Sequence, residues 1–133
     1  MTKLLRRAVF GAILASSFAV TGMVAAADGL SLSNKWRIEV SEGANNDGTI
    51  LFRVTPKEGT PVDVTVQIKD GRSENGVAVD IRETLKKSLD SKVYHVERDD
   101  GEDVLVKKRK GPDFELKLVE STLKGTRINV EKE

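Results

Sequence analysis

Residues 62–89, VDVTVQIKDGRSENGVAVDIRETLKKSL, contain a change of apolar period that decides the fold. Over residues 62–68, β-branched residues alternate with polar ones, which predicts a strand with one buried face. Apolar residues then recur every four positions, at Val77, Ile81, Leu85 and Leu89. This second spacing predicts an amphipathic helix from Glu74 to Leu89, with Ser73 or Asn75 as its N-cap. We therefore expect a strand followed directly by a helix in the middle of the chain.

Alternation with a period of two continues on both sides of this stretch and predicts six further strands. Two precede residues 62–68 and four follow the helix, and they cover residues 36–40, 50–54, 93–98, 104–108, 114–120 and 126–130. The connectors after the helix are short, which predicts that the strands there form antiparallel hairpins. The predicted fold is α+β: one mostly antiparallel sheet of six to seven strands, in the order βββ-α-ββββ, with one amphipathic helix packed on one face.

The inward-facing positions of these elements predict the hydrophobic core. They are the apolar residues at alternate strand positions and the apolar residues four apart on the helix. The predicted core residues are Trp36, Ile38, Phe52, Val64, Val66, Ile68, Ile81, Leu85, Leu89, Tyr94, Val96, Leu116, Leu118 and Ile128. A single core of this size is sufficient for one small domain.

The start of the chain has the three parts of a secretory signal peptide. Three basic residues give a positive beginning, residues 8–20 are apolar and uncharged, and a series of small residues ends at Ala27. A retained membrane anchor is the alternative, but a run rich in alanine, serine and valine that ends in a cleavage site favours removal. The predicted organisation is a cleavable signal peptide at 1–27, a flexible lead-in at 28–34 and a single α+β domain at 35–133.

This organisation predicts a periplasmic or secreted protein. The sequence has no cysteine, so neither disulfides nor a lipid on cysteine are available, and we expect no stable membrane anchor after processing. Three of the 22 basic residues lie in the signal, which leaves 19 against 21 acidic residues in the processed chain. Because this charge is nearly balanced and few aromatic residues are present for base stacking, we expect no nucleic-acid partner.

Two runs of charge flank the predicted strand at 104–108. An acidic run around Gly101 precedes it, and a basic run ends it. We expect the two runs to face each other across a hairpin, where opposite charges stabilise strand pairing and lysines protect an edge. The functional alternative is contact with a partner, either a protein or an anionic component of the cell envelope. The candidate partner-binding residues are Lys107, Lys108, Arg109, Lys110, Asp99 and Asp100.

The sequence contains no recognisable catalytic or metal-binding motif. His95 is the only histidine, no Gly-x-Ser-x-Gly motif is present, and a zinc site is disfavoured without cysteine. We therefore predict no catalytic residue, no cofactor and no bound metal. Three alternatives stay open: a hydrolase that joins His95 to a serine and a carboxylate, calcium at the acidic residues 99–103, and an apolar ligand in a cavity lined by Leu85, Leu89 and Phe114.

Residues 64–130 resemble the small strand–helix–strand modules of phage tail sheath and bacterial adhesin-type proteins. The resemblance lies in a strand, a helix of the Val-Ala-x-x-Ile type, and hairpin strands that end in apolar alternation. The matching residues are Val77, Ala78, Ile81, Leu85, Val96, Val104, Val106, Gly111, Leu116 and Ile128. The resemblance implies a structural or binding role and transfers no site. We therefore predict an exported, non-enzymatic binding or envelope-assembly domain, with a small inhibitor of an envelope or foreign hydrolase as the alternative.

Overall fold

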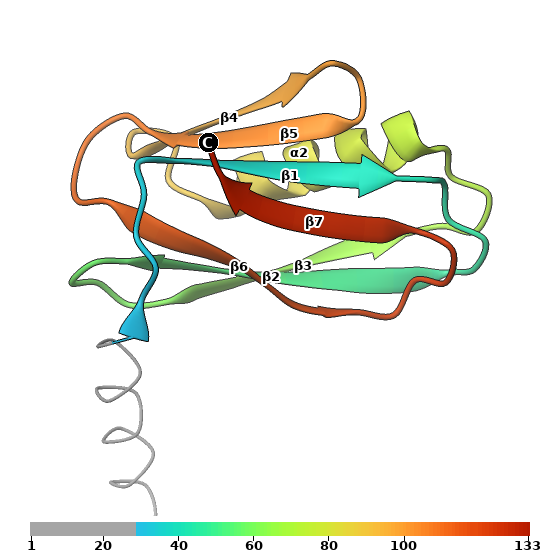
Figure 1. Cartoon of the computed structure of the whole chain (residues 1–133), viewed down its shortest axis with the longest axis horizontal. Helices are drawn as coiled ribbons and strands as arrows, with labels where there is room; N and C mark the ends of the chain where they lie inside the picture. Colours follow the sequence, from blue (N-terminus) through green and yellow to red (C-terminus); the bar gives the residue numbers. More distant parts are fainter. Residues whose placement is uncertain (1–28) are drawn as a thin grey trace, which may run out of the picture. The chain divides into compact units, whose positions relative to one another are not determined.

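In residues 29–133, which the computed structural model describes, seven strands and one helix follow one another in the predicted order (Figure 1). The fold is α+β, and residues 31–133 form one structural unit. The predicted signal peptide at 1–27 lies outside the described residues. The elements are β1 (Lys35–Ser41), β2 (Gly48–Pro56), β3 (Val62–Ile68), α2 (Glu74–Ser88), β4 (Tyr94–Asp99), β5 (Asp103–Lys108), β6 (Phe114–Ser121) and β7 (Arg127–Lys132).

The strands form two antiparallel sheets rather than the single sheet expected from the sequence. One sheet has the order β4-β5-β1-β7, and the other has the order β3-β2-β6. Figure 1 shows them as two layers that lie one above the other. Strands of both sheets bury their apolar positions in a common core, so each sheet covers the apolar face of the other.

Two of the short connectors after the helix join strands of different sheets, so the hairpins expected there do not form. β4 pairs with β5 as predicted, but β6 pairs with β2 and β7 pairs with β1. In the β5–β6 connector, the Lys108 ammonium lies 2.9 Å from a carboxylate oxygen of Asp113 and donates to the carbonyl of Gly111. Gly111 has a φ of 89°, a conformation that glycine adopts without a steric penalty. This turn directs the chain from one layer to the other.

Helix α2 begins at a serine cap and packs against both sheets. The Ser73 side chain accepts a 3.0 Å hydrogen bond from the backbone N–H of Gly76, so Ser73 rather than Asn75 is the cap of the two that the sequence allowed. Val77, Ile81 and Leu85 are fully buried. The helix contacts β3 in one sheet and β1, β4 and β5 in the other, so it does not lie on one face of a single sheet as expected. Within residues 29–133, no helix is long and apolar enough to span a membrane.

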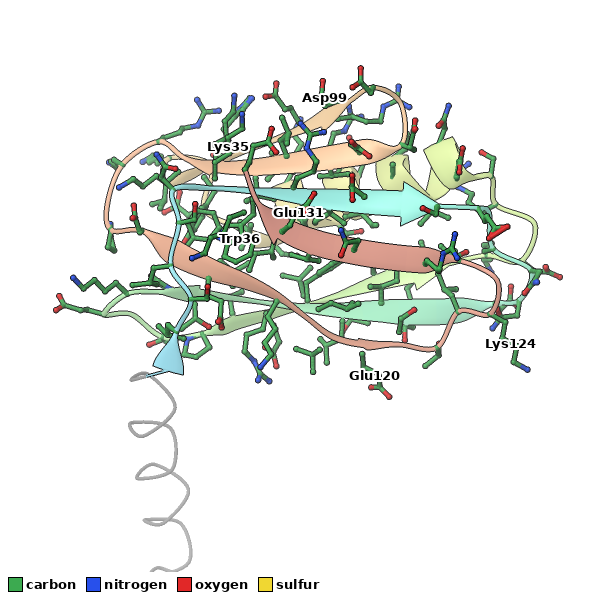
Figure 2. The ribbon with its side chains drawn as sticks, in the orientation of Figure 1. Lys35, Trp36, Asp99, Glu120, Lys124 and Glu131 are labelled. Atoms are coloured by element: carbon green, nitrogen blue, oxygen red, sulfur yellow. The ribbon has the colours of Figure 1, made fainter. Side chains whose placement is uncertain are left out.

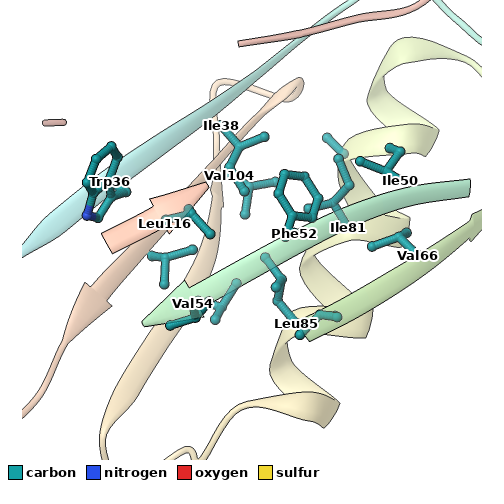
Figure 3. Packing of buried hydrophobic residues seen from close by; sticks show 14 of the residues in the cluster. Trp36, Ile38, Ile50, Phe52, Val54, Val66, Ile81, Leu85, Val104 and Leu116 are labelled. Carbon is teal, nitrogen blue, oxygen red and sulfur yellow. The ribbon is translucent and has the colours of Figure 1, made fainter. Parts of the chain in front are cut away.

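The core contains residues from both sheets and from the helix (Figure 3). The Phe52 side chain has no exposed surface, and Ile38 and Ile81, from the opposite sheet and the helix, are equally buried. The predicted core is confirmed except at Leu118 and Ile128, which are only partly buried and pack against it from the outside. The core also contains residues that the prediction omitted, among them Ile50, Val54, Val104, Val106 and Phe114.

The segment from Ser31 to Asn34, expected to be part of a flexible lead-in, is attached to β6. Ser33 and Phe114 exchange two backbone hydrogen bonds, each 3.0 Å long. The indole N–H of Trp36 also donates to the Phe114 carbonyl, at 2.9 Å and in a buried position. The folded domain therefore begins before Lys35, because these bonds fix the entering chain against the second sheet.

Candidate functional site

The first two cations of the basic run are paired with acids. Lys107 Nζ lies 2.8 Å from a carboxylate oxygen of Glu97 on β4, and Lys108 Nζ lies 2.9 Å from Asp113. The first pair joins neighbouring strands, and the second closes the β5–β6 turn. Lys107 and Lys108 therefore have a structural use, and acids close to them offset their charge.

The next two cations, Arg109 and Lys110, form no ion pair with any acid of residues 29–133. The Arg109 guanidinium instead lies 2.9 Å from Nδ1 of His95. Because a guanidinium only donates hydrogen bonds, Nδ1 of His95 is the acceptor in this contact. Both cations are exposed. The uncompensated positive charge of the basic run therefore belongs to Arg109 and Lys110.

The acidic residues that we named with this run lie at the other end of the hairpin. The register places Asp99 opposite Asp103, next to the turn, and the basic run lies at the far end of β5. Asp99 lies 3.2 Å from the guanidinium of Arg37, and Asp100 is an exposed turn residue with a φ of 48°. Figure 2 shows Asp99 at the edge of the larger sheet, on the β4–β5 hairpin. The expectation that the two runs face each other is wrong, because a hairpin aligns positions equidistant from its turn.

An open groove of about 620 Å³ lies beside Lys110. The β2–β3 connection, the end of α2 with the loop that follows it, and the β5–β6 turn contribute its walls. Its apolar lining residues are Pro56, Val62, Leu89, Val93, Tyr94 and Pro112. Val62 is 39% exposed, which is high for a large apolar side chain in this protein. The carboxylates of Glu58 and Asp90 also line the groove, so its polar lining is mixed in sign.

The groove is not the apolar cavity considered from the sequence. Of the three residues named for that cavity, Leu85 and Phe114 are fully buried in the core and only Leu89 lines the groove. Two of the three therefore pack against core residues and leave no surface for a ligand. The apolar-carrier alternative loses its expected cavity for this reason.

A smaller pocket of about 130 Å³ adjoins the groove and shares Leu89 and Tyr94 with it. Its polar lining residues are Lys86, Ser91, His95 and Arg109. Lys86 is exposed in the last turn of α2, and no acid in the described part of the chain pairs with it. Each of these four side chains has a hydrogen-bond donor, and none of them is an acid. The pocket therefore suits an anionic group.

Tyr94 is a wall common to the groove and the pocket. Its ring packs edge-on against the buried ring of Phe114, with centroids 5.0 Å apart and planes at 76°. Burial raises the pKa of the Tyr94 hydroxyl above its usual value, so this hydroxyl stays protonated at neutral pH. Tyr94 therefore supplies a fixed aromatic surface without a charge.

The geometry around His95 does not favour the hydrolase alternative. Ser91 lines the same pocket, but no hydrogen bond joins it to His95 in the described residues. Nδ1 of the ring faces Arg109, and Nε2 lies 3.5 Å from a carboxylate oxygen of Glu97. A serine nucleophile needs an imidazole nitrogen that is free to accept its proton. For the calcium alternative, no group of three metal-ligating side chains is gathered anywhere in residues 29–133.

No protein-family model, curated protein or solved structure matches the chain. The site is therefore defined by this chain's own residues. Sequence patterns point to Arg109 and Lys110 but not to Lys86, Ser91 or Val62, because three other parts of the chain contribute these residues. The one local signal for Lys86 is its position in the last helical turn, which is a common place for basic residues for electrostatic reasons alone.

We expect Glu97→Gln to lower the stability of the fold slightly at neutral pH and less in acid. Lys107, and to a smaller extent His95, hold the pKa of Glu97 below its usual value of 4.5. Such a carboxylate stabilises the fold above its unfolded-state pKa, and the stabilisation is lost as pH falls through its folded-state pKa. The Lys107 and Glu97 side chains are 38% and 39% exposed, so the effect at pH 7 should be below about 1 kcal/mol.

Urea denaturation of the protein and the variant at pH 7 and pH 3 measures this difference in the free energy of unfolding. Glu120→Gln is the matched control, because Glu120 is exposed on β6 and pairs with no base among the described residues. If the difference in stability between Glu97→Gln and the unmodified protein grew from pH 7 to pH 3, the stabilising role of the Glu97–Lys107 ion pair would be contradicted.

Proposed function

We propose that this protein is a non-enzymatic binding domain that acts outside the cytoplasm and contacts an anionic partner through Arg109 and Lys110. The observation that carries the proposal is that these two cations, which form no ion pair with an acid of residues 29–133, lie beside an apolar groove and its adjoining pocket. Uncompensated charge attracts and orients a partner, and apolar surface supplies contact area. Assembly within the cell envelope is one form that such binding takes.

The chemistry of the site supports binding over catalysis. The pocket contains donors from Lys86 and Arg109, and its imidazole has no free nitrogen for a serine proton. Action outside the cytoplasm rests on the sequence pattern of residues 1–27. The partner that fits this site is a protein or another envelope component that carries negative charge.

Reversal of both charges, in Arg109→Glu with Lys110→Glu, is expected to reduce partner capture at least tenfold. The reason is that the variant replaces the attraction to an anionic partner by repulsion. The measurement uses the full chain with a tag, purified from its own cells at low salt, with co-purified proteins quantified by mass spectrometry. A wash at high salt should release the same partner, because screening weakens exposed charge pairs.

Lys117→Glu with Lys124→Glu is the matched control for this variant. Both lysines are exposed, and the double substitution changes the net charge by the same amount at positions that line neither the groove nor the pocket. It should leave capture unchanged. Equal losses in the two double variants would indicate a dependence on net charge alone, and undiminished capture by the first would remove Arg109 and Lys110 from the interface.

A further inference from the structure

We infer that the ligand of this site is a short extended segment of a partner protein in which an acidic side chain lies next to a large apolar one. The acid enters the pocket lined by Lys86, His95 and Arg109, and the apolar side chain enters the groove beside Val62. This inference rests on the proposed function and names the chemistry that the same site recognises.

The pocket selects an acid because two cations and a histidine from three parts of the chain converge on it. Lys86 lies at the end of α2, His95 lies on β4, and Arg109 directly follows β5. The acid nearest to His95 is Glu97, and Lys107 engages its carboxylate at 2.8 Å. His95 Nε2 also faces Glu97, at 3.5 Å, so an incoming carboxylate meets the ammonium of Lys86 and the guanidinium of Arg109, which no acid of residues 29–133 engages. Charge-assisted hydrogen bonds of this kind are the strong ones.

The groove selects an apolar side chain next to the acid. It adjoins the pocket along Leu89 and Tyr94, so a residue next to the acid reaches it directly. Glu58 and Asp90 also line the groove and repel a second acid there. The two sites together thus define an order, with the acid at the pocket and the apolar residue in the groove.

The shape of the site favours a protein segment over a small molecule or a lipid. Small-molecule sites usually enclose most of their ligand, whereas this groove is open and contacts one side of an occupant. An acyl chain would need an enclosed cavity, and Leu85 and Phe114 are instead packed without exposed surface. A protein segment fits an open groove, because the rest of the partner protein contacts the side of the segment that the groove does not.

Selection from a random heptapeptide library on the immobilised protein tests this inference. Enriched sequences should contain Asp or Glu one or two residues from Leu, Phe or Trp. With Lys86→Glu the acid should disappear from the enriched sequences. Lys87→Glu is the matched control, because Lys87 is the next exposed lysine of the same helix and lines neither the groove nor the pocket.

Affinity for one selected peptide, measured by fluorescence anisotropy, separates the two parts of the site. Lys86→Glu should weaken binding at least tenfold, and Val62→Asn at least about fivefold, since it removes apolar contact without adding charge. Val119→Asn is the control for the second variant, because Val119 is also 39% exposed but lies on β6, away from the groove. Both controls should change affinity less than twofold.

Three outcomes would overturn the inference: no common pattern among the selected peptides, enrichment of acid alone with Val62→Asn having no effect, or binding of phosphatidylglycerol vesicles without binding of the selected peptides. The inference can also fail while the proposed function stands. If Arg109→Glu with Lys110→Glu abolishes partner capture while Lys86→Glu and Val62→Asn do not affect it, the binding domain stands and the segment chemistry is wrong.

Discussion

Replacement of Phe52 by alanine is expected to lower the free energy of unfolding by about 3–5 kcal/mol. The Phe52 side chain has no exposed surface, and its strand, β2, is the central strand of its sheet. Figure 3 shows the ring among Ile38, Val104 and Ile81, which come from the other sheet and the helix. Truncation therefore opens a cavity where three elements meet, and a loss of this size is a large part of the 5–15 kcal/mol typical of a domain.

Urea denaturation at 25 °C measures this loss. Val119→Ala is the control, because Val119 is 39% exposed on the edge strand β6 and its truncation should change stability by no more than about 0.5 kcal/mol. Similar losses in the two variants would show that Phe52 does not lie in a closed core.

Replacement of Arg37 by glutamine is expected to lower the free energy of unfolding by about 1–2 kcal/mol, between the values for an exposed ion pair and for hydrogen bonds to a buried charge. Arg37 Nη1 lies 2.6 Å from Asp103 and 3.2 Å from Asp99, and Nη2 lies 2.8 Å from Glu133. The Arg37 side chain is only 16% exposed. One guanidinium thus joins the β4–β5 hairpin to Glu133, and its loss removes the hydrogen-bond donor that three carboxylates share.

Arg53→Gln is the matched control for Arg37. Arg53 also binds an acid with two hydrogen bonds, to Asp63 at 2.7 and 3.0 Å, but the two side chains are 41% and 47% exposed. Arg53→Gln should therefore lower the free energy of unfolding by less than about 1 kcal/mol, and by still less at high salt. Chemical denaturation of both variants at pH 7 gives the comparison. An Arg53 effect equal to or larger than the Arg37 effect would contradict the importance of the three-carboxylate cluster.

Local periodicity predicts the elements of this fold closely and their pairing poorly. The helix at 74–88 and strand β3 agree with the pattern of residues 62–89, because side-chain period depends only on the local backbone. The division into two sheets depends instead on which strands meet, and the register of Trp36 with both Val106 and Lys132 joins distant parts of the sequence. Connector length is a weak guide here, because a five-residue connector can close a hairpin or cross between layers.

The candidate site is predictable only where one continuous run supplies it. The basic run points to Arg109 and Lys110, but sequence cannot show that Lys107 and Lys108 are already paired, since their acids lie on another strand and after a turn. Lys86 and Val62 join the site only through the packing of the helix end against neighbouring loops. A lysine on a helix and a valine on a strand are common in any sequence, and only the fold shows that these two lie at one site.

The place of β1 in its sheet has a consequence for the timing of folding. β1 lies between β5 and β7, and its residue Trp36 is in register with Lys132, next to the last residue of the chain. A growing chain therefore holds an early strand whose second neighbour does not yet exist. Pairing of distant segments is slow, because a long loop must close before its contacts form. The four-stranded sheet is therefore complete only after β7 has been synthesised and has paired with β1.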